Sequence, residues 1–422
     1  MDLRDTPEQA AFRAKVRAWI EDHRHEAPPM VAGMHTDDPR PFRAWQSKLA
    51  KAGLVGVTWP QEYGGAGLTP IEEVIVSAEL RKAGCPGIID HIAVGDCGPT
   101  IIAFGTDEQK ARHLGPLLHG DEGWCQLFSE PGAGSDLAGV ATRAKRTEDG
   151  WVVNGQKVWT TLAQFADWGL LLARTDPDVP KHAGLSMFLI DMHAPGVTVR
   201  PLRQISGGSH FNEVFFDDVE LPESALLGPQ DGGWGVAMTT LMFERMTLLA
   251  AFEQLGWSAE SMVEPMLGHE RLQDGDVRQR IAEVTCDLLS MRYAGYRALT
   301  ALARGEIPGL ESGLGKIGLI EAGRKGSGLI AEVLGPDALE GDAGHFAAEM
   351  PGLRSGGGTN EILGNTLGER VLGLPAEPRI DKTVPFSELS SNGAARASGS
   401  AAEGRASNSE REAGRLAEVT PS

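Results

Sequence analysis

The sequence has few of the features that mark membrane proteins or disulfide-rich secreted proteins. Four cysteines occur in 422 residues, and their spacing matches no metal-binding pattern: Cys85, Cys97, Cys125 and Cys286. No stretch approaches the ~18 consecutive apolar residues of a membrane-spanning helix. The first 24 residues lack the apolar core of a signal peptide and predict a helix. We therefore expect a cytoplasmic protein with free thiols, no metal site and no membrane partner.

Basic residues are outnumbered, with 39 Lys and Arg against 58 Asp and Glu and a formal net charge of -19. This excess of negative charge argues against nucleic acid as a partner, because phosphate backbones are bound by Lys and Arg. Glycine is abundant instead, at 54 residues. That share is nearly twice the usual ~7% and indicates many tight turns or close approaches of the backbone.

The pattern of apolar residues changes twice along the chain, which is too long for one core of ordinary size. Residues 1–122 contain helix-like stretches that end at glycines. Residues 123–230 alternate short apolar runs with Asp-Gly and Asn-Gly turns and predict a central antiparallel β barrel or sandwich. Residues 231–378 return to the helical period and predict a four-helix bundle. Residues 379–422, rich in Ala, Ser and Gly, predict a disordered tail.

The densest motif, QLFSEPGAGSD at residues 126–136, joins an expected strand to a glycine loop. Glycines on both sides of Ala133 would let several backbone N–H groups point at one place, as in a small anion-binding nest. A glycine loop that merely connects two strands is the alternative, and the G-x-G pattern alone favours it.

A second motif, KVWTT at residues 157–161, follows an Asn-Gly turn. Alternation along a strand places Trp159 and Thr161 on the same side. An aromatic ring beside a hydroxyl suits a planar heteroaromatic ligand with polar edges, although a single Trp is more often core packing.

Together the two motifs resemble the acyl-CoA dehydrogenase family, whose pattern is roughly [TS]-E-P-x-A-G-S-D followed by N-G-x-K-x-[WYF]-[IT]-[TS]. The resemblance extends over residues 5–375 and includes WPQEYGGAG at 59–67 and GGTNEI to ERVLGLP at 357–375. It implies an N-terminal α-helical domain, a central β domain and a C-terminal helical bundle. It also implies an oxidoreductase of lipid metabolism that uses FAD to oxidise an acyl-CoA thioester to the 2,3-enoyl-CoA.

The resemblance assigns roles to matching positions of this sequence. Contacts with the cofactor are implied for Gln126, Leu127, Phe128, Ser129, Gly134, Ser135, Trp159, Thr160, Thr161, Thr359 and Glu361. Contacts with the substrate are implied for Ser135, Met242, Phe243, Arg245 and Gly358. Trp159 would lie against the flavin face, and Thr161 would bond near the flavin N5.

The reaction also needs a carboxylate that removes the α-proton of the thioester, with a pKa raised by burial. In the commonest family arrangement this is the Glu of a Tyr-Glu-Gly-Thr stretch, where the present sequence has Gly357. Isovaleryl- and long-chain-type members instead carry it before an Arg on the first long helix of the C-terminal domain, which matches Glu244 and Arg245. Glu244 is therefore our candidate for the catalytic base, although a mid-helix Glu is more often solvated or ion-paired.

Two departures from the family fall where one subunit would hold a neighbour's cofactor. Residues 270–280 lack the usual Arg-x-x-Phe-Gly stretch, and residues 333–339 replace a Phe-Gly-Gly loop. We expect a homodimer or homotetramer with altered contacts, and the alternative is a heterotetramer whose partner chain completes the FAD site. An electron-transfer flavoprotein is the expected electron acceptor. A flavin monooxygenase or oxidase on the same scaffold and a non-catalytic subunit are the other functions that the sequence allows.

Overall fold

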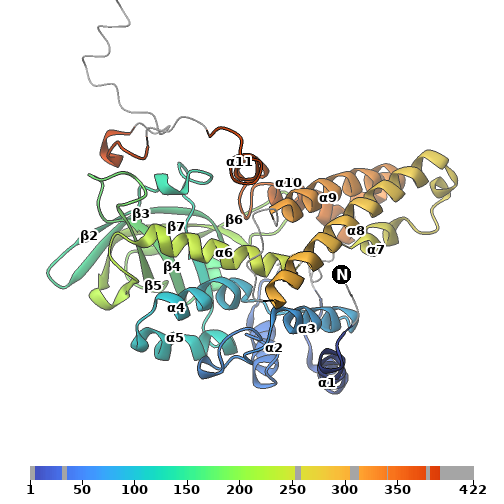
Figure 1. Ribbon diagram of the computed structural model, residues 1–422, viewed down its shortest axis with the longest axis horizontal. Coiled ribbons are helices and arrows are strands. Elements are labelled where there is room, and N and C mark those ends of the chain that lie inside the picture. The colour runs from blue at the N-terminus through green and yellow to red at the C-terminus, as the bar shows by residue number, and fades with distance from the viewer. Residues whose placement is uncertain are drawn as a thin grey trace, which may run out of the picture.

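The computed structural model describes residues 5–30, 36–251, 258–304, 313–339, 341–376 and 381–389. Helices at the N-terminal side, a β-sheet and a second set of helices follow one another along the chain (Figure 1). The predicted order of α, β and α regions is confirmed. The first helices are α1 (Pro7–His23), α2 (Arg40–Lys51), α3 (Pro70–Lys82), α4 (Gly98–Phe104) and α5 (Asp107–His119).

Local sequence explains where several of these helices begin and end. Thr6, Thr69 and Thr106 precede α1, α3 and α5, and each side chain accepts a backbone N–H of the first turn in a capping box. Gly53 and Gly84 follow α2 and α3 with φ of 72° and 69°, a conformation that stops a helix and favours glycine.

A π-helical segment, η3 (Ala93–Cys97), leads directly into α4. Such wide turns are rare and often occur at functional sites, because they change the direction of the side chains that follow. Both η3 and α4 pack against α6 (Gly233–Ala251), the first helix after the sheet. The same helix contacts α3 and strands of the sheet, so it joins the N-terminal helices to the β domain.

The sheet contains eight strands, in the order β6-β7-β3-β2-β4-β5-β8, with β1 paired to β4 beside this path. The strands are β1 (Trp124–Leu127), β2 (Arg143–Arg146), β3 (Gly150–Thr161), β4 (Trp168–Arg174), β5 (Leu185–Asp191), β6 (Val197–Leu202), β7 (Phe211–Pro222) and β8 (Leu226–Leu227). The predicted central antiparallel β domain is confirmed for most strand pairs, but β1 and β2 both pair with β4 in parallel. Turn dipeptides reveal only neighbouring antiparallel pairs, whereas these parallel pairs depend on long crossovers.

The sheet separates two apolar cores, and alternation along β4 shows why. Leu170 and Leu172 face the core that contains the N-terminal helices, while Leu171 and Ala173 face a second core on the opposite side. Val236 and Ala237 of α6 join the first core. The β domain is therefore held to the helices by buried apolar side chains.

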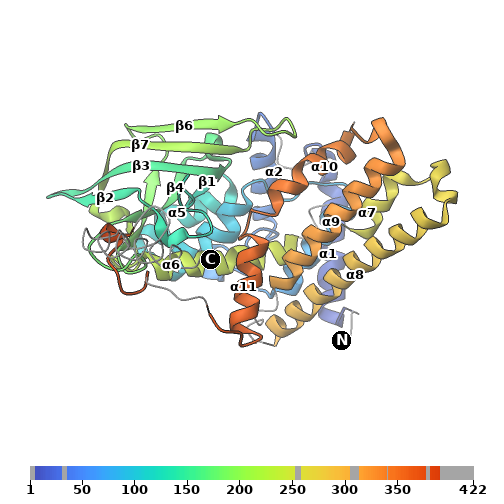
Figure 2. The same ribbon diagram turned by 90° about the horizontal axis from the view of Figure 1, so that it is seen from above.

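The remaining helices are α7 (Ala259–Val263), α8 (Gly275–Ala303), α9 (Gly313–Leu334), α10 (Gly341–Leu353) and α11 (Asn360–Arg370). Side chains of α7 to α10 form a third core of their own. Helices α8 and α9 run side by side over most of their length, and α10 and α11 pack on α9 (Figures 1 and 2).

The predicted tail begins with an ordered segment, so the prediction of disorder from residue 379 is wrong for residues 381–389. Phe386 and Ser387 donate backbone N–H groups to the carbonyls of Val179 and Pro177. The guanidinium of Arg174 lies 3.6 Å from the centre of the Phe386 ring. These anchors come from specific contacts that composition does not reveal. Residues 379, 380 and 390–422 lie outside the described part of the chain.

Other expectations concern absences. No helix in the described ranges is long and apolar enough to cross a membrane. Within the same ranges no group of three His, Cys, Asp or Glu side chains could hold a metal ion. All four cysteines are free thiols, and Cys286 is the exposed one.

The contacts of residues 381–389 predict different effects for two C-terminal truncations. Ending the chain after residue 376 removes these contacts and should lower the apparent unfolding temperature by about 2–6 °C. Ending it after residue 389 keeps them and should leave that temperature within about 1 °C of the full chain. Differential scanning fluorimetry of the three purified proteins makes the comparison, and equal effects of both truncations would contradict the assigned contacts.

Candidate active site

A buried ion pair fixes the glycine loop to the sheet. The Lys157 side chain, 0% exposed, places Nζ 2.8 Å from Oε1 of Glu130 and donates to the carbonyl of Phe128 at 2.9 Å. Glu130 also accepts the backbone N–H groups of Ala141 and Thr142. Burial lowers the pKa of Lys157 to about 8, and the adjacent Glu130 carboxylate opposes that shift. The two sequence motifs are thus joined by a charge pair that the motif analysis missed. A lysine among the apolar residues of an expected strand was the only sign of this pair in the sequence.

The glycines of this loop face open space. A Cβ added at Gly132 or Gly134 would meet no atom within 4 Å, so the protein's own packing does not require glycine there. Gly134 and Ser135 are exposed, and their backbone can be approached from outside. Beyond them, Lys181 Nζ lies 2.7 Å and 2.9 Å from the two carboxylate oxygens of Asp136 and 2.8 Å from Asp381. The C-terminal segment therefore also braces the end of the loop.

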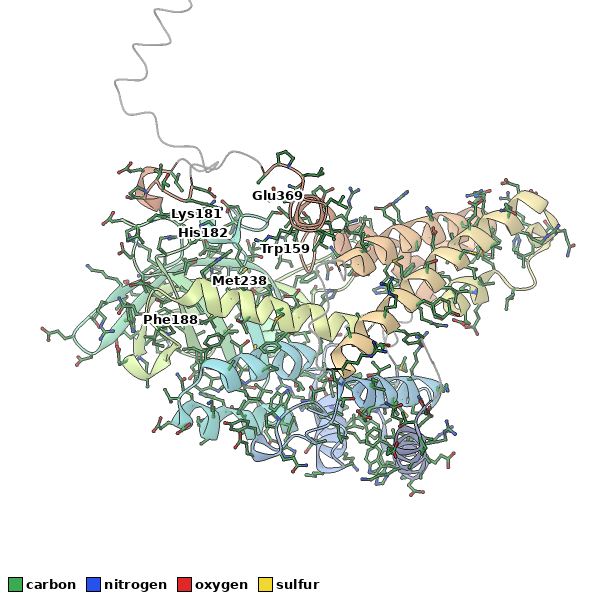
Figure 3. All side chains as sticks on the ribbon, in the orientation of Figure 1. Trp159, Lys181, His182, Phe188, Met238 and Glu369 are labelled. Carbon is green, nitrogen blue, oxygen red and sulfur yellow. The ribbon has the colours of Figure 1, made fainter. Side chains whose placement is uncertain are left out.

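Trp159 is a large apolar side chain in an exposed position, with 61% of its surface accessible. It has a φ of 63° and sits at a bulge in the β3–β7 ladder between Lys157 and Thr160. A tryptophan in this left-handed conformation is strained, and such strain persists where the surroundings hold it. The bulge presents the ring to solvent on the side of the sheet nearest α11 (Figure 3).

Simple alternation does not describe the rest of KVWTT. Thr161 is half-buried, whereas the Thr160 side chain is 1% exposed and its hydroxyl oxygen has no hydrogen-bond partner among the described residues. The side chains of Leu127 and Phe128 are likewise buried in the apolar cores. A ligand at this surface can therefore meet only the backbone of these three residues, while Gln126 and Ser129 remain half-buried at the edge.

The segment that replaces the usual loop carboxylate is a left-handed turn. Gly357 and Gly358 have φ of 64° and 86°, and the Thr359 hydroxyl accepts the N–H of Ile362 to cap α11. Glu361 is exposed and forms an ion pair of 2.7 Å with Arg354. Lys316 of α9, also missed by the sequence reasoning, donates to the carbonyls of Arg354, at 3.1 Å, and Gly358. Burial lowers the pKa of Lys316 to about 8, against the opposing effects of Glu244 and Glu361.

Glu244 is half-buried on α6, among groups from two other elements. Burial first, and the Glu244 carboxylate second, raise the pKa of Asp96 in η3 well above its usual value. Glu244 is thus within electrostatic reach of both Asp96 and Lys316. Of the other candidates on α6, Met242 is exposed and Phe243 half-buried. The side chain of Arg245 lies outside the described part of the structure.

Three domain models of one family match this chain. The acyl-CoA dehydrogenase N-terminal domain matches residues 6–121, the middle domain residues 125–219 and the C-terminal domain residues 231–372. The chain belongs to the acyl-CoA dehydrogenase family. Acyl-CoA dehydrogenase IpdE1 of Mycobacterium tuberculosis is 38% identical over 382 residues, which cover 87% of this chain and 98% of that protein.

Solved structures of the family have the same fold. One described as Tcur3481-Tcur3483 steroid ACAD is 29% identical with a TM-score of 0.77, and the match covers 89% of this chain and 100% of that chain. The ChsE4-ChsE5 complex from Mycobacterium tuberculosis is 27% identical with a TM-score of 0.74, at 89% and 100% coverage.

As a member of this family the protein is an FAD-dependent oxidoreductase that dehydrogenates acyl-CoA. The described surface fits the flavin, since the exposed Trp159 ring, the open backbone at Gly134 and the hydroxyls of Ser129 and Thr161 suit an aromatic ring with polar edges. When bound, FAD accepts the hydride that leaves the acyl chain.

The buried ion pair predicts a stability defect that a second substitution relieves. Glu130→Gln leaves the Lys157 ammonium buried without its counter-charge and should lower the free energy of unfolding by about 3 kcal/mol. The double variant Glu130→Gln/Lys157→Met removes both charges and should lose less. Urea unfolding of both proteins tests this, and a double variant less stable than Glu130→Gln alone would show that the lysine is not held by charge.

Proposed function

We propose that this enzyme oxidises the CoA thioester of a ring-bearing or branched acid to its 2,3-enoyl-CoA, with Glu244 as the base. The observation that carries the assignment of the base is the position of Glu244. It is half-buried on α6, within electrostatic reach of Lys316, whose ammonium holds the Gly358 turn. The usual position of the base in that turn is occupied by Gly357, which has no side chain to take a proton.

The acyl group is inferred from relatives and from the space at this turn. A similar structure is described as a steroid ACAD. A glycine in place of a glutamate at position 357 removes a side chain from this turn, which favours a bulky acyl group over a straight chain. We also propose an electron-transfer flavoprotein as electron acceptor, the cytoplasm as location and a role in lipid breakdown.

In the proposed reaction Glu244 takes the proton, and the residues of the glycine loop and of strand β3 hold the substrate and the cofactor. The Glu244 carboxylate removes the α-proton and becomes a neutral acid, and the hydride of the β-carbon would go to the bound cofactor, so that the C–C single bond becomes a double bond. Ser135 and the exposed backbone of Gly134 would hold the thioester and the cofactor, and Thr161 would donate a hydrogen bond at the flavin edge. Trp159 would lie against the flavin and keep water from it.

Glu244→Gln tests the proposed base, because the amide cannot accept the proton. Flavin bleaching under anaerobic, single-turnover conditions should slow by at least about 1000-fold. The panel of substrates comprises butyryl-CoA, octanoyl-CoA, isovaleryl-CoA and a steroid side-chain CoA. Glu264→Gln, an exposed position of the same domain, is the matched control and should bleach at the wild-type rate.

Bleaching of Glu244→Gln at the wild-type rate would refute the assignment of the base. Rapid oxygen consumption by the reduced enzyme would instead support the alternative of an oxidase or monooxygenase, which may dispense with Glu244.

We propose further that the chain assembles with a second, related chain. Large apolar side chains are exposed on the C-terminal helices and the segments beside them, which indicates a surface that packs against another subunit. They include Tyr293, Leu314, Leu339, Ile362, Leu372 and Leu374. Two similar structures are described with paired names, Tcur3481-Tcur3483 and ChsE4-ChsE5. These paired names favour a heteromer over the homotetramer expected from the sequence, and a homotetramer is the other outcome of the test.

The flavin content of the purified protein distinguishes these assemblies. If a second chain completes the FAD site, the protein expressed alone should hold less than about half an equivalent of FAD and approach one equivalent only with that chain. Absorbance at 450 nm, measured with light-scattering mass, gives both values. A yellow homotetramer with one FAD per chain would overturn the heteromeric proposal and leave the proposed chemistry intact.

A further inference from the structure

The bulge that carries Trp159 leaves the regular β ladder on both of its sides. Val158 and Trp159 lie opposite the single residue Glu213, so β3 has one residue more than β7 at this point. The N–H of Val158 donates instead to the carbonyl of Ser129, at 2.9 Å. Leu162, three residues after Trp159, has a φ of 55°. Bulges redirect side chains, and non-glycine residues with positive φ persist only where other contacts hold them.

Asn212 of β7 supplies such contacts from a position that is 0% exposed. Its side-chain nitrogen lies 3.0 Å from the carbonyl oxygen of Thr160 and 3.3 Å from that of His210. The same nitrogen lies 2.5 Å from Oε1 of Gln164. The amide therefore connects the backbone that follows the bulge in β3 to the backbone that precedes β7.

These contacts require a hydrogen-bond donor at position 212. A carboxylate there would place oxygen against three other oxygens and would be repelled. Oδ1 of Asn212 has no hydrogen-bond partner among the described residues. A buried oxygen without a partner destabilises a fold, so packing alone would favour an apolar side chain at this position. The donors of the amide, rather than its packing, therefore explain an asparagine here.

Two further hydrogen bonds hold the segment that follows Trp159. Nε2 of Gln164 donates to the carbonyl of Ser209 at 3.1 Å. The N–H of Leu162 donates to the carbonyl of His210 at 2.7 Å. Residues 160–164 are thus joined to residues 209–212 by backbone and side-chain bonds, with the Asn212 amide between them.

The indole of Trp159 contacts the residue beside Asn212. Its ring meets the Phe211 ring edge-on, with centroids 5.9 Å apart and planes at 87° (Trp159 is labelled in Figure 3). The ring of His210, which is 5% exposed, packs on Phe211 in turn with centroids 4.4 Å apart. A change in the backbone of residues 210–212 would therefore reach the exposed indole as well.

We propose that Asn212 is a positioning residue that holds Trp159 in the orientation in which its indole lies against the flavin. Because the Asn212 side chain is fully buried, it acts through the backbone of Thr160 and not by contact with the cofactor. The inference rests on the proposed contact between Trp159 and the flavin. Asn212 lies outside the motifs that indicate the family.

Bound-flavin fluorescence tests this role, because an indole against the ring quenches the excited flavin by electron transfer. The enzyme is loaded with FAD, together with its partner chain if FAD retention requires one, and free FAD is removed by gel filtration. Asn212→Leu keeps the branched shape without a donor and should raise the fluorescence per bound FAD at least about twofold, because the indole moves off the ring. Flavin reduction by the fastest thioester of the panel should slow about 10-fold.

The double variant Asn212→Leu/Trp159→Phe distinguishes positioning from general damage. Phenylalanine keeps an aromatic ring but does not quench flavin as indole does, so Trp159→Phe alone should raise the fluorescence. If Asn212 acts through Trp159, the double variant should match Trp159→Phe in fluorescence and in reduction rate instead of adding the two effects.

Asn154→Leu is the matched control. Asn154 stands at the other irregularity of the β3–β7 ladder, where its Nδ2 donates to Oδ1 of Asp218 at 2.9 Å. Its replacement should leave the bound-flavin fluorescence and the reduction rate unchanged.

Gln164→Met is a milder second variant, which tests the inference even if Asn212→Leu does not fold. It removes one acceptor of the Asn212 amide and the bond to Ser209. Both readouts should change in the same direction as in Asn212→Leu, but less. The unfolding temperature of each variant shows whether it is folded.

Additive effects in the double variant would overturn the inference, since they indicate damage that does not act through Trp159. Wild-type fluorescence in every folded variant of Asn212 and Gln164 would do so as well. If Trp159→Phe itself leaves the bound-flavin fluorescence unchanged, the proposed contact of Trp159 with the flavin is wrong and the inference fails with it. If Trp159→Phe raises the fluorescence while the Asn212 and Gln164 variants do not, only the present inference fails.

Discussion

The ion pair between Lys157 and Glu130 is the interaction on which the candidate site depends. It joins the glycine loop after β1 to strand β3, and the two motifs that define the family meet there. Lys157 directly precedes the bulge that turns Trp159 outward, so the same contact supports the strained conformation of that tryptophan. With both partners buried, the pair gains from a low local dielectric constant, and the loss of either would leave an uncompensated charge.

Helix α6 carries Glu244, the proposed base, and packs between the N-terminal helices and the sheet. Its first turns belong to the core that the sheet shares with the N-terminal helices, through Val236 and Ala237. Further along, Thr240 contacts Thr100, and Glu244, four residues after Thr240, is within electrostatic reach of Asp96 and Lys316. A shift of this helix would therefore change its packing against both the N-terminal helices and the sheet, so α6 is a rigid support for Glu244.

Much of the fold could be predicted because it depends on local signals. Helix-stopping glycines, Asp-Gly and Asn-Gly turns and the helical period of apolar residues indicated the α, β and α regions, and these are confirmed. Parallel pairing of β1 with β4 and the ordered segment at 381–389 were not predicted, because both arise from contacts between residues distant in the chain. The same holds for Trp159, whose exposure comes from a bulge rather than from strand alternation.

The sequence by itself determined the family and the residue types available to the site, because a motif consists of residue types at fixed spacings along the chain. In this way we could recognise Gly357 in place of a glutamate and Glu244 before Arg245. Only the tertiary structure decided which charges act on one another. Asp96, Glu244 and Lys316 come from η3, α6 and α9, and electrostatic interaction depends on their separation in space and on burial, neither of which a linear pattern contains.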